Sequence, residues 1–95
     1  MKIELDKIYQ SDCLFFCKKI KDNFCNLIVI DPPYNELPHK WDNFNNWLEL
    51  KKEFNRILKK NGQIYIFGKQ PMLSDIYFEF KDLFNFRFVF NFKNP

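Results

Sequence analysis

Hydrophobic residues recur at two kinds of spacing along this chain, and the first kind predicts three helices. Apolar positions three and four residues apart mark one face of a helix. This spacing covers, in order, residues 13–20, 45–60 and 71–84. Asp12 suits the N-cap of the first helix, and Pro71 suits the first turn of the third. The pair Asn61-Gly62 suits the end of the second helix.

Short apolar runs, the second kind of pattern, predict four strands. They cover, in order, residues 7–10, 26–30, 63–68 and 86–92. The run "NLIVI" at 26–30 shows no polar alternation, which is typical of a strand buried on both faces of a parallel sheet. Strands alternate with helices along the chain. This order predicts an α/β fold with a mostly parallel sheet, flanking helices and a single small domain over residues 1–95.

Two acids directly follow predicted strands. Asp12 comes after the first strand and Asp31 after the second. In sheets of this class the working groups lie just beyond the carboxyl ends of the strands. We therefore expect both acids on one rim of the sheet. Phe67 and Gly68 end the third strand on the same rim, where they would line a pocket, although Gly68 would also serve simply as a turn residue.

Composition favours a folded protein without demanding a particular partner. Of the 95 residues, 46% are hydrophobic and 13 are phenylalanine, whereas disordered chains are poor in aromatic residues. The formal charge of +3 is compatible with a polyanionic partner but too small to require one.

Several classes of protein are disfavoured by the sequence. No apolar run reaches the roughly 20 residues of a membrane helix. Acids stand in "MKIELDKIYQSD" where a secretory leader has its apolar stretch, so a cytoplasmic location is expected. The thiols of Cys13, Cys17 and Cys25 are expected to be reduced. We expect no metal, since a site needs about four ligands and the single histidine, His39, lies far from the cysteines.

The tetrapeptide Asp31-Pro32-Pro33-Tyr34 is stereochemically stiff, because each proline fixes its own φ and restricts the residue before it. It presents a carboxylate, a backbone carbonyl and an aromatic ring in a fixed relation. Two acceptors beside a stacking ring make a receptor for a planar group that carries an NH2. A loop without chemistry is the alternative, since Asp-Pro is common in turns.

"DPPY" after an apolar strand resembles the catalytic motif of the amino-methylating DNA methyltransferases. These enzymes modify N6 of adenine or N4 of cytosine with S-adenosylmethionine. The resemblance extends through "IYQSDCLFFCKKIKDNFCNLIVIDPPYN", "KWDNF" and "EFNRILKKNGQIYIFG", and so covers nearly the whole chain. It implies a Rossmann-like methyltransferase fold, S-adenosylmethionine as cofactor and double-stranded DNA as partner.

The resemblance also implies roles for individual residues. The catalytic group would be Asp31, Pro32, Pro33 and Tyr34. In it, Asp31 and the Pro32 carbonyl would hold the target amine, and Tyr34 would stack on a base flipped out of the duplex. The residues expected near the cofactor are Asp12, Asp31, Phe67 and Gly68. For Asp12 the helix N-cap remains an equal alternative.

The loop after the motif would lie over the target DNA. Its expected DNA-binding residues are Asn35, His39, Lys40 and Trp41. His39 and Lys40 would touch phosphate or would simply be solvated loop residues. Trp41 would act as a lid or would pack at the start of the following helix.

Glycine usage departs from the family's pattern. The family needs a glycine-rich loop close to the cofactor, but the chain has only Gly62 and Gly68, in no Phe-x-Gly-x-Gly pattern. The 30 residues before Asp31 contain no glycine, so the order resembles the permuted class, in which the catalytic half comes first. We therefore expect an incomplete amino-terminal part of a DNA methylase N-4/N-6 domain, either truncated or completed by a second polypeptide with the glycine-rich loop and the target-recognition region.

Three hypotheses for function follow. The first is a site-specific DNA methyltransferase, or its fragment, inactive or weakly active and self-associating when alone; Asp at the first motif position favours adenine N6. The second is a catalytically dead remnant or a partner-binding module, which the missing glycine loop favours. The third is a protein-glutamine or RNA methyltransferase, against which Asp31 counts because Asn usually opens that motif.

Overall fold

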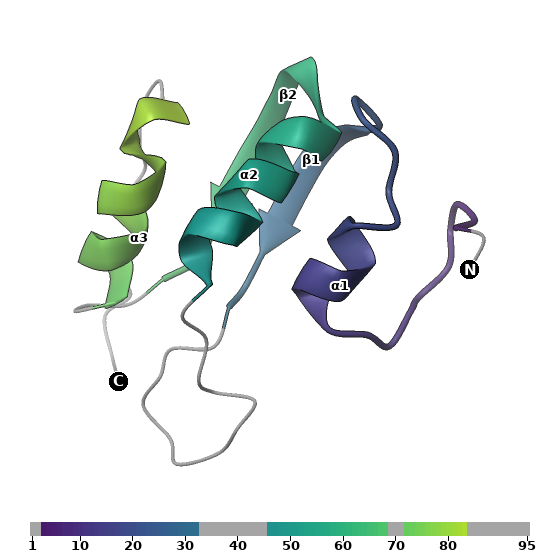
Figure 1. Cartoon of the computed structure of the whole chain (residues 1–95), viewed down its shortest axis with the longest axis horizontal. Helices are drawn as coiled ribbons and strands as arrows, with labels where there is room; N and C mark the ends of the chain where they lie inside the picture. Colours follow the sequence, from purple (N-terminus) through teal and green to yellow (C-terminus); the bar gives the residue numbers. More distant parts are fainter. Residues whose placement is uncertain (1–2, 33–45, 69–71, 84–95) are drawn as a thin grey trace, which may run out of the picture.

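The computed structural model describes residues 3–32, 46–68 and 72–83, in which helices pack on a small parallel sheet (Figure 1). The elements are α1 (Cys13–Cys17), β1 (Cys25–Ile30), α2 (Trp47–Ile57), β2 (Leu58–Ile66), α3 (Met72–Phe80) and the short 3-10 helix η2 (Lys81–Leu83). This arrangement confirms the α/β class and the parallel pairing.

The sheet is formed by β1 and β2, which run parallel on either side of the crossover helix α2 in sequence. Ile28 is paired with Ile64, and Ile30 with Ile66. The register is regular over these last residues of both strands and shifts only between Cys25 and Leu27. The two carboxyl ends are consequently level with each other.

The hydrophobic core lies between the three helices and one face of the sheet. The helices supply the buried residues Leu14, Cys17, Trp47, Leu50, Phe54, Ile57, Met72, Ile76 and Phe80. The strands add partly buried isoleucines that pack against this cluster, namely Ile28, Ile30, Ile64 and Ile66. Phe80 is fully buried, with its ring centroid 6.2 Å from that of Trp47 and 6.5 Å from that of Phe54. It therefore joins α3 to α2.

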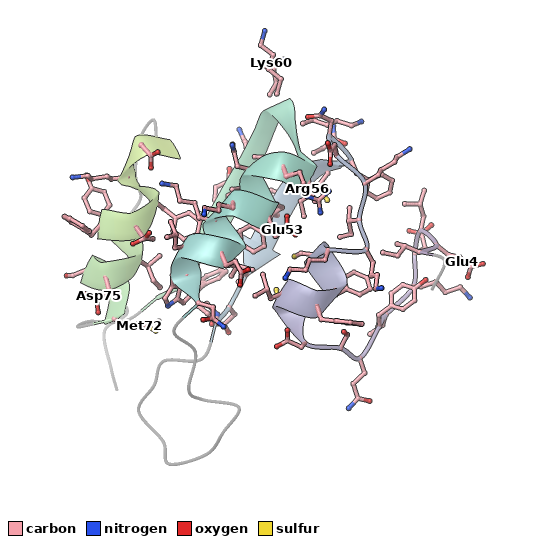
Figure 2. The ribbon with its side chains drawn as sticks, viewed as in Figure 1. Glu4, Glu53, Arg56, Lys60, Met72 and Asp75 are labelled. Carbon is pink, nitrogen blue, oxygen red and sulfur yellow. The ribbon has the colours of Figure 1, made fainter. Side chains whose placement is uncertain are left out.

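Arg56, near the end of α2, binds the segment that leads from α1 to β1. Its guanidinium donates to the backbone carbonyls of Cys17 (2.9 Å) and Ile20 (2.8 Å). It also pairs with the carboxylates of Asp22 and Glu53, each at 2.7 Å. In Figure 2 the labelled Arg56 and Glu53 lie on the side of α2 that faces α1. Two carbonyls at and after the end of the short helix α1 thus receive a charged donor, in addition to the Ile20 N–H that the Cys17 carbonyl accepts at 3.0 Å.

The strand predicted at residues 7–10 is wrong, since the structure has no regular element there. Ile8 is fully exposed, and no strand lies beside it in the described part of the chain. Tyr9 instead packs on Phe16 of α1, with ring centroids 5.1 Å apart, and its hydroxyl accepts the Glu4 N–H at 2.8 Å. A short apolar run without a strand to pair with does not form a ladder.

Helices α1 and α2 both end earlier in the chain than the spacing of hydrophobic residues predicted. The first helix stops at Cys17 rather than residue 20, and α2 stops at Ile57 rather than residue 60. Asn61 and Gly62 consequently lie inside β2 and do not end a helix. For α2 the cause is a tertiary contact. Backbone N–H groups of the segment before β1 donate hydrogen bonds to the last carbonyls of α2, and the Phe24 N–H donates to the Ile57 carbonyl at 2.7 Å.

The expectation that β1 is buried on both faces is also wrong for the described residues. Leu27 is 53% exposed and Val29 58% exposed, because α1, α2 and α3 all pack on the opposite face. The strand predicted at 86–92, Pro71 and the predicted helix ends at residues 45 and 84 lie outside the described residues.

Replacing Phe80 by alanine tests the core. Because Phe80 is fully buried between α2 and α3, we expect Phe80→Ala to lower the free energy of unfolding by about 3–5 kcal/mol. The control Phe78→Ala removes a phenylalanine of the same helix that is 69% exposed and should cost less than about 1 kcal/mol. Urea unfolding followed by circular dichroism measures both. Equal losses of unfolding free energy in the two variants would contradict the placement of the core between α2 and α3.

Candidate active site at the carboxyl ends of the strands

The predicted site residues that follow the two strands lie next to each other. Asp31 and Pro32 come directly after β1, and Phe67 and Gly68 directly after β2. The Phe67 N–H donates to the carbonyl of Ile30 at 3.0 Å, so the ladder continues one residue past the strand end. This rim is the place at which α/β sheets hold their ligands.

Local chemistry explains why the ladder stops at this corner. Proline has no N–H to donate, so Pro32 cannot extend the pairing of β1. Pro32 is buried, whereas Asp31 before it is exposed. Across the rim, Phe67 is 53% exposed. The result is an exposed carboxylate next to the buried Pro32, with a half-exposed aromatic ring after the neighbouring strand.

Asp12 is the N-cap of α1. Its carboxylate oxygen Oδ2 accepts the backbone N–H of Phe15 at 3.0 Å. The N-cap alternative is therefore confirmed, which leaves the second carboxylate oxygen for other contacts. In Figure 1, α1 begins on the side of the sheet toward which β1 and β2 point. The start of α1, which Asp12 caps, is thus at the same end of the molecule as the carboxyl end of β1.

The space next to Gly68 bears on cofactor binding. A Cβ atom at Gly68 would lie 2.6 Å from Cδ1 of Leu73 in α3, so a larger residue here would require the end of this leucine side chain to move. In the structure the leucine side chain occupies the space next to Gly68. The cofactor contacts predicted for Asp12, Asp31 and Phe67 stay predictions.

Cys13, beside Asp12, has an unusual thiol. A hydrogen bond from Cys17, four residues along α1, lowers the pKa of Cys13, against the opposing effects of burial and of the Asp12 charge. The same hydrogen bond and burial raise the pKa of Cys17, and burial raises that of Cys25. Cys13 is exposed and free. It is therefore the thiol most easily ionised at this end of α1.

The remaining predicted site residues fall in segments that the structure does not describe. They are Pro33, Tyr34, Asn35, His39, Lys40 and Trp41, and their roles stay predictions. Conversely, no pattern in the sequence selects Arg56, because its carbonyl partners Ile20 and Cys17 lie 36 and 39 residues away along the chain.

The described residues contain neither a cluster of metal ligands nor a membrane-spanning helix. Over residues 3–32, 46–68 and 72–83, no three His, Cys, Asp or Glu side chains are grouped as ligands of a metal ion. None of the helices in these ranges has the length and apolar character needed to span a membrane.

Comparison with known proteins gives several methyltransferases and no matching family model. The type II methyltransferase M1.MboII of Moraxella bovis is 34% identical over 74 residues, which is 70% of this chain and 28% of that protein. The type II methyltransferase M.HpaI of Haemophilus parainfluenzae is 36% identical over 77 residues, 70% of this chain and 24% of that protein.

The DNA adenine methyltransferase YhdJ of Escherichia coli K12 is similar over more of the chain. It is 34% identical over 93 residues, which cover 88% of this chain and 32% of YhdJ. These similarities support the methyltransferase family for this chain. The chain spans only a quarter to a third of the length of these relatives.

Two substitutions separate the structural role of Asp12 from its charge. Asp12→Ala removes the acceptor for the Phe15 N–H and should lower the free energy of unfolding by about 1 kcal/mol. Asp12→Asn keeps an oxygen acceptor and should stay within a few tenths of the wild-type value. Urea denaturation measures both. If the asparagine variant lost as much stability as the alanine variant, the N-cap assignment would be wrong.

Proposed function

We propose that residues 1–95 form the amino-terminal catalytic part of a DNA methyltransferase of the N-4/N-6 type with a Rossmann-like fold and the permuted order of parts. It would methylate the exocyclic amine of a flipped base in double-stranded DNA. The observation that carries this proposal is the placement of Asp31 and Pro32 directly after β1, beside the end of β2. Similarity to a DNA adenine methyltransferase favours N6 of adenine as the target.

The chemistry follows from what a base amine needs. Its nitrogen lone pair is delocalised into the ring, so the free amine is a poor nucleophile. The Asp31 carboxylate and the Pro32 carbonyl would accept hydrogen bonds from its two N–H groups. They would favour a tetrahedral nitrogen, whose lone pair is no longer shared with the ring and points at an electrophile. Such acceptors stabilise the transition state because they are already in place. S-adenosylmethionine would supply the electrophilic methyl group.

Other residues would bind and orient the substrates. Tyr34 would stack on the flipped base, with Pro33 keeping it in a fixed relation to Asp31. Asn35, His39, Lys40 and Trp41 would contact DNA. Toward the cofactor, Asp12 would offer its second carboxylate oxygen, and Phe67 its exposed ring.

A further part of the enzyme is required by this proposal. Leu73 fills the space next to Gly68, and Gly62 lies inside β2, so neither glycine provides a cofactor loop. The glycine-rich loop and the target-recognition region would come from sequence outside these residues or from a second polypeptide. The expected setting is the cytoplasm, where DNA and S-adenosylmethionine are both present.

A remnant without activity is the second candidate. One observation favours this candidate: Gly68 lies against the side chain of Leu73, and Gly62 lies inside β2. Complementation distinguishes the two candidates, because a remnant would stay inactive whatever is added to it.

The test uses a complementing fragment, which we define as the part of Escherichia coli YhdJ outside the third of that protein that aligns with this chain. Mixed with the fragment, the chain should transfer labelled methyl groups from S-adenosylmethionine to unmethylated double-stranded DNA. Asp31→Ala should lower this rate on the order of 100-fold or more, because one of the two acceptors is lost.

Asp82→Ala is the matched control. Asp82 is an exposed acid in η2 that pairs with Lys51 at 2.7 Å, away from the rim, so its loss should leave the rate nearly unchanged. The proposal would be contradicted by a rate that is insensitive to Asp31→Ala, or by methyl groups that appear only in protein or RNA.

A further inference from the structure

Two thiols of α1 form a pair in which one member is accessible and the other is buried. Cys13 and Cys17 lie four residues apart, so their side chains share one face of the helix. Cys13 is exposed, whereas Cys17 is 5% exposed and belongs to the hydrophobic core. The Cys17 thiol donates a hydrogen bond to the Cys13 sulfur and lowers the pKa of Cys13. A sulfur that solvent reaches is therefore in contact with a second thiol beneath it.

We propose that Cys13 and Cys17 are a site of reversible oxidation, at which a small-molecule disulfide converts the two thiols into an intramolecular disulfide and opens the first turn of α1. This inference is independent of the proposed function. Cys13 reacts first, because it is the accessible thiol and the more readily ionised one. An accessible thiol of lowered pKa beside a second thiol is the arrangement found in redox-sensing proteins.

The oxidation consists of two thiol–disulfide exchanges. The Cys13 thiolate attacks one sulfur of the small disulfide, whose S–S bond breaks, and a first small thiolate leaves. Cys13 is then uncharged, which weakens the hydrogen bond that is the largest cause of the raised pKa of Cys17. Cys17 gives its proton to water, attacks the Cys13 sulfur and displaces the second small thiolate. The two cysteines thus lose two electrons and two protons, and one small disulfide becomes two thiols.

The intramolecular disulfide requires α1 to change shape. Cβ atoms four residues apart on a helix are separated by about 5–6 Å, whereas a disulfide holds its Cβ atoms about 3.5–4.5 Å apart. Cys17 is held in place, because it is buried and its carbonyl accepts the Arg56 guanidinium at 2.9 Å. Cys13 must therefore move, and it directly follows Asp12, whose carboxylate caps the Phe15 N–H. Oxidation consequently breaks this cap, and a disulfide that distorts its surroundings is readily reduced again.

The experiment incubates the 95-residue chain with glutathione disulfide and maps the products by mass spectrometry after trypsin digestion. Cleavage after Lys7 and Lys18 puts Cys13 and Cys17 on one peptide and Cys25 on another. The wild type should form the Cys13–Cys17 disulfide. The control Cys25→Ala, which removes the thiol of β1, should react in the same way.

Two variants separate the roles of the paired thiols. Cys13→Ala should react with glutathione disulfide at least about tenfold more slowly, because the remaining thiols are not exposed. Cys17→Ala should stop at a mixed disulfide between Cys13 and glutathione, because the thiol that displaces glutathione is missing. Circular dichroism verifies that the three variants keep the wild-type fold.

Hydrogen exchange measures the change in α1. After oxidation the Phe15 N–H should exchange on the order of fivefold faster or more, because it has lost its acceptor. Reduction with dithiothreitol should restore the slow exchange. The Leu50 N–H is the matched control, since it donates to the Asn46 carbonyl at 3.0 Å in the first turn of α2 and should not change.

Several results would overturn the inference. A wild-type chain that does not react with glutathione disulfide, a disulfide between Cys17 and Cys25, or a rate unaffected by Cys13→Ala would each exclude the oxidation site. A Cys13–Cys17 disulfide with unchanged exchange at Phe15 would exclude the opening of the first turn of α1.

Discussion

The parallel pairing of β1 with β2 determines where the candidate groups that directly follow the two strands lie. Because Ile30 is paired with Ile66, the residues after the two strands emerge side by side at one edge. Asp31 and Pro32 therefore stand beside Phe67, and the Phe67 N–H completes the ladder by donating to the Ile30 carbonyl. If β1 were shifted by one residue against β2, its side chains would move to the opposite face of the sheet, and the Asp31 carboxylate would no longer lie on the same side as Phe67.

The same pairing requires a helix layer, and the helices of the described residues provide it on one side of the sheet. The fully buried residues Leu50, Ile57, Ile76 and Phe80 all come from α2 and α3, while Arg56 adds α1 through the carbonyls of Cys17 and Ile20. The other side of the sheet keeps Leu27 and Val29 exposed. The core thus positions the rim from the side of the sheet that carries the helices.

Much of this arrangement was predictable from local pattern. The β-branched run at 26–30 and the spacing of Trp47, Leu50 and Phe54 located β1 and α2, and Asp12 was identified as an N-cap. Predictions from the local pattern were wrong where long-range contacts determine the secondary structure. Ile8 has no neighbouring strand in the described part of the chain. Helix α2 ends where the Phe24 N–H donates to the Ile57 carbonyl. The burial of β1 on one face alone could not be predicted either, because a run of apolar residues does not show which face of the strand packs against helices.

The central claim is that this chain supplies the amine-binding half of a methyltransferase site and that its cofactor loop lies elsewhere. The most direct test is calorimetric titration of S-adenosylmethionine into the chain, into the complementing fragment and into their mixture. The account predicts no binding to the chain alone and clear binding to the mixture, weakened when Asp12→Asn removes the charge while keeping the cap. Binding to the chain alone, or none to a mixture in which the two parts associate, would contradict it.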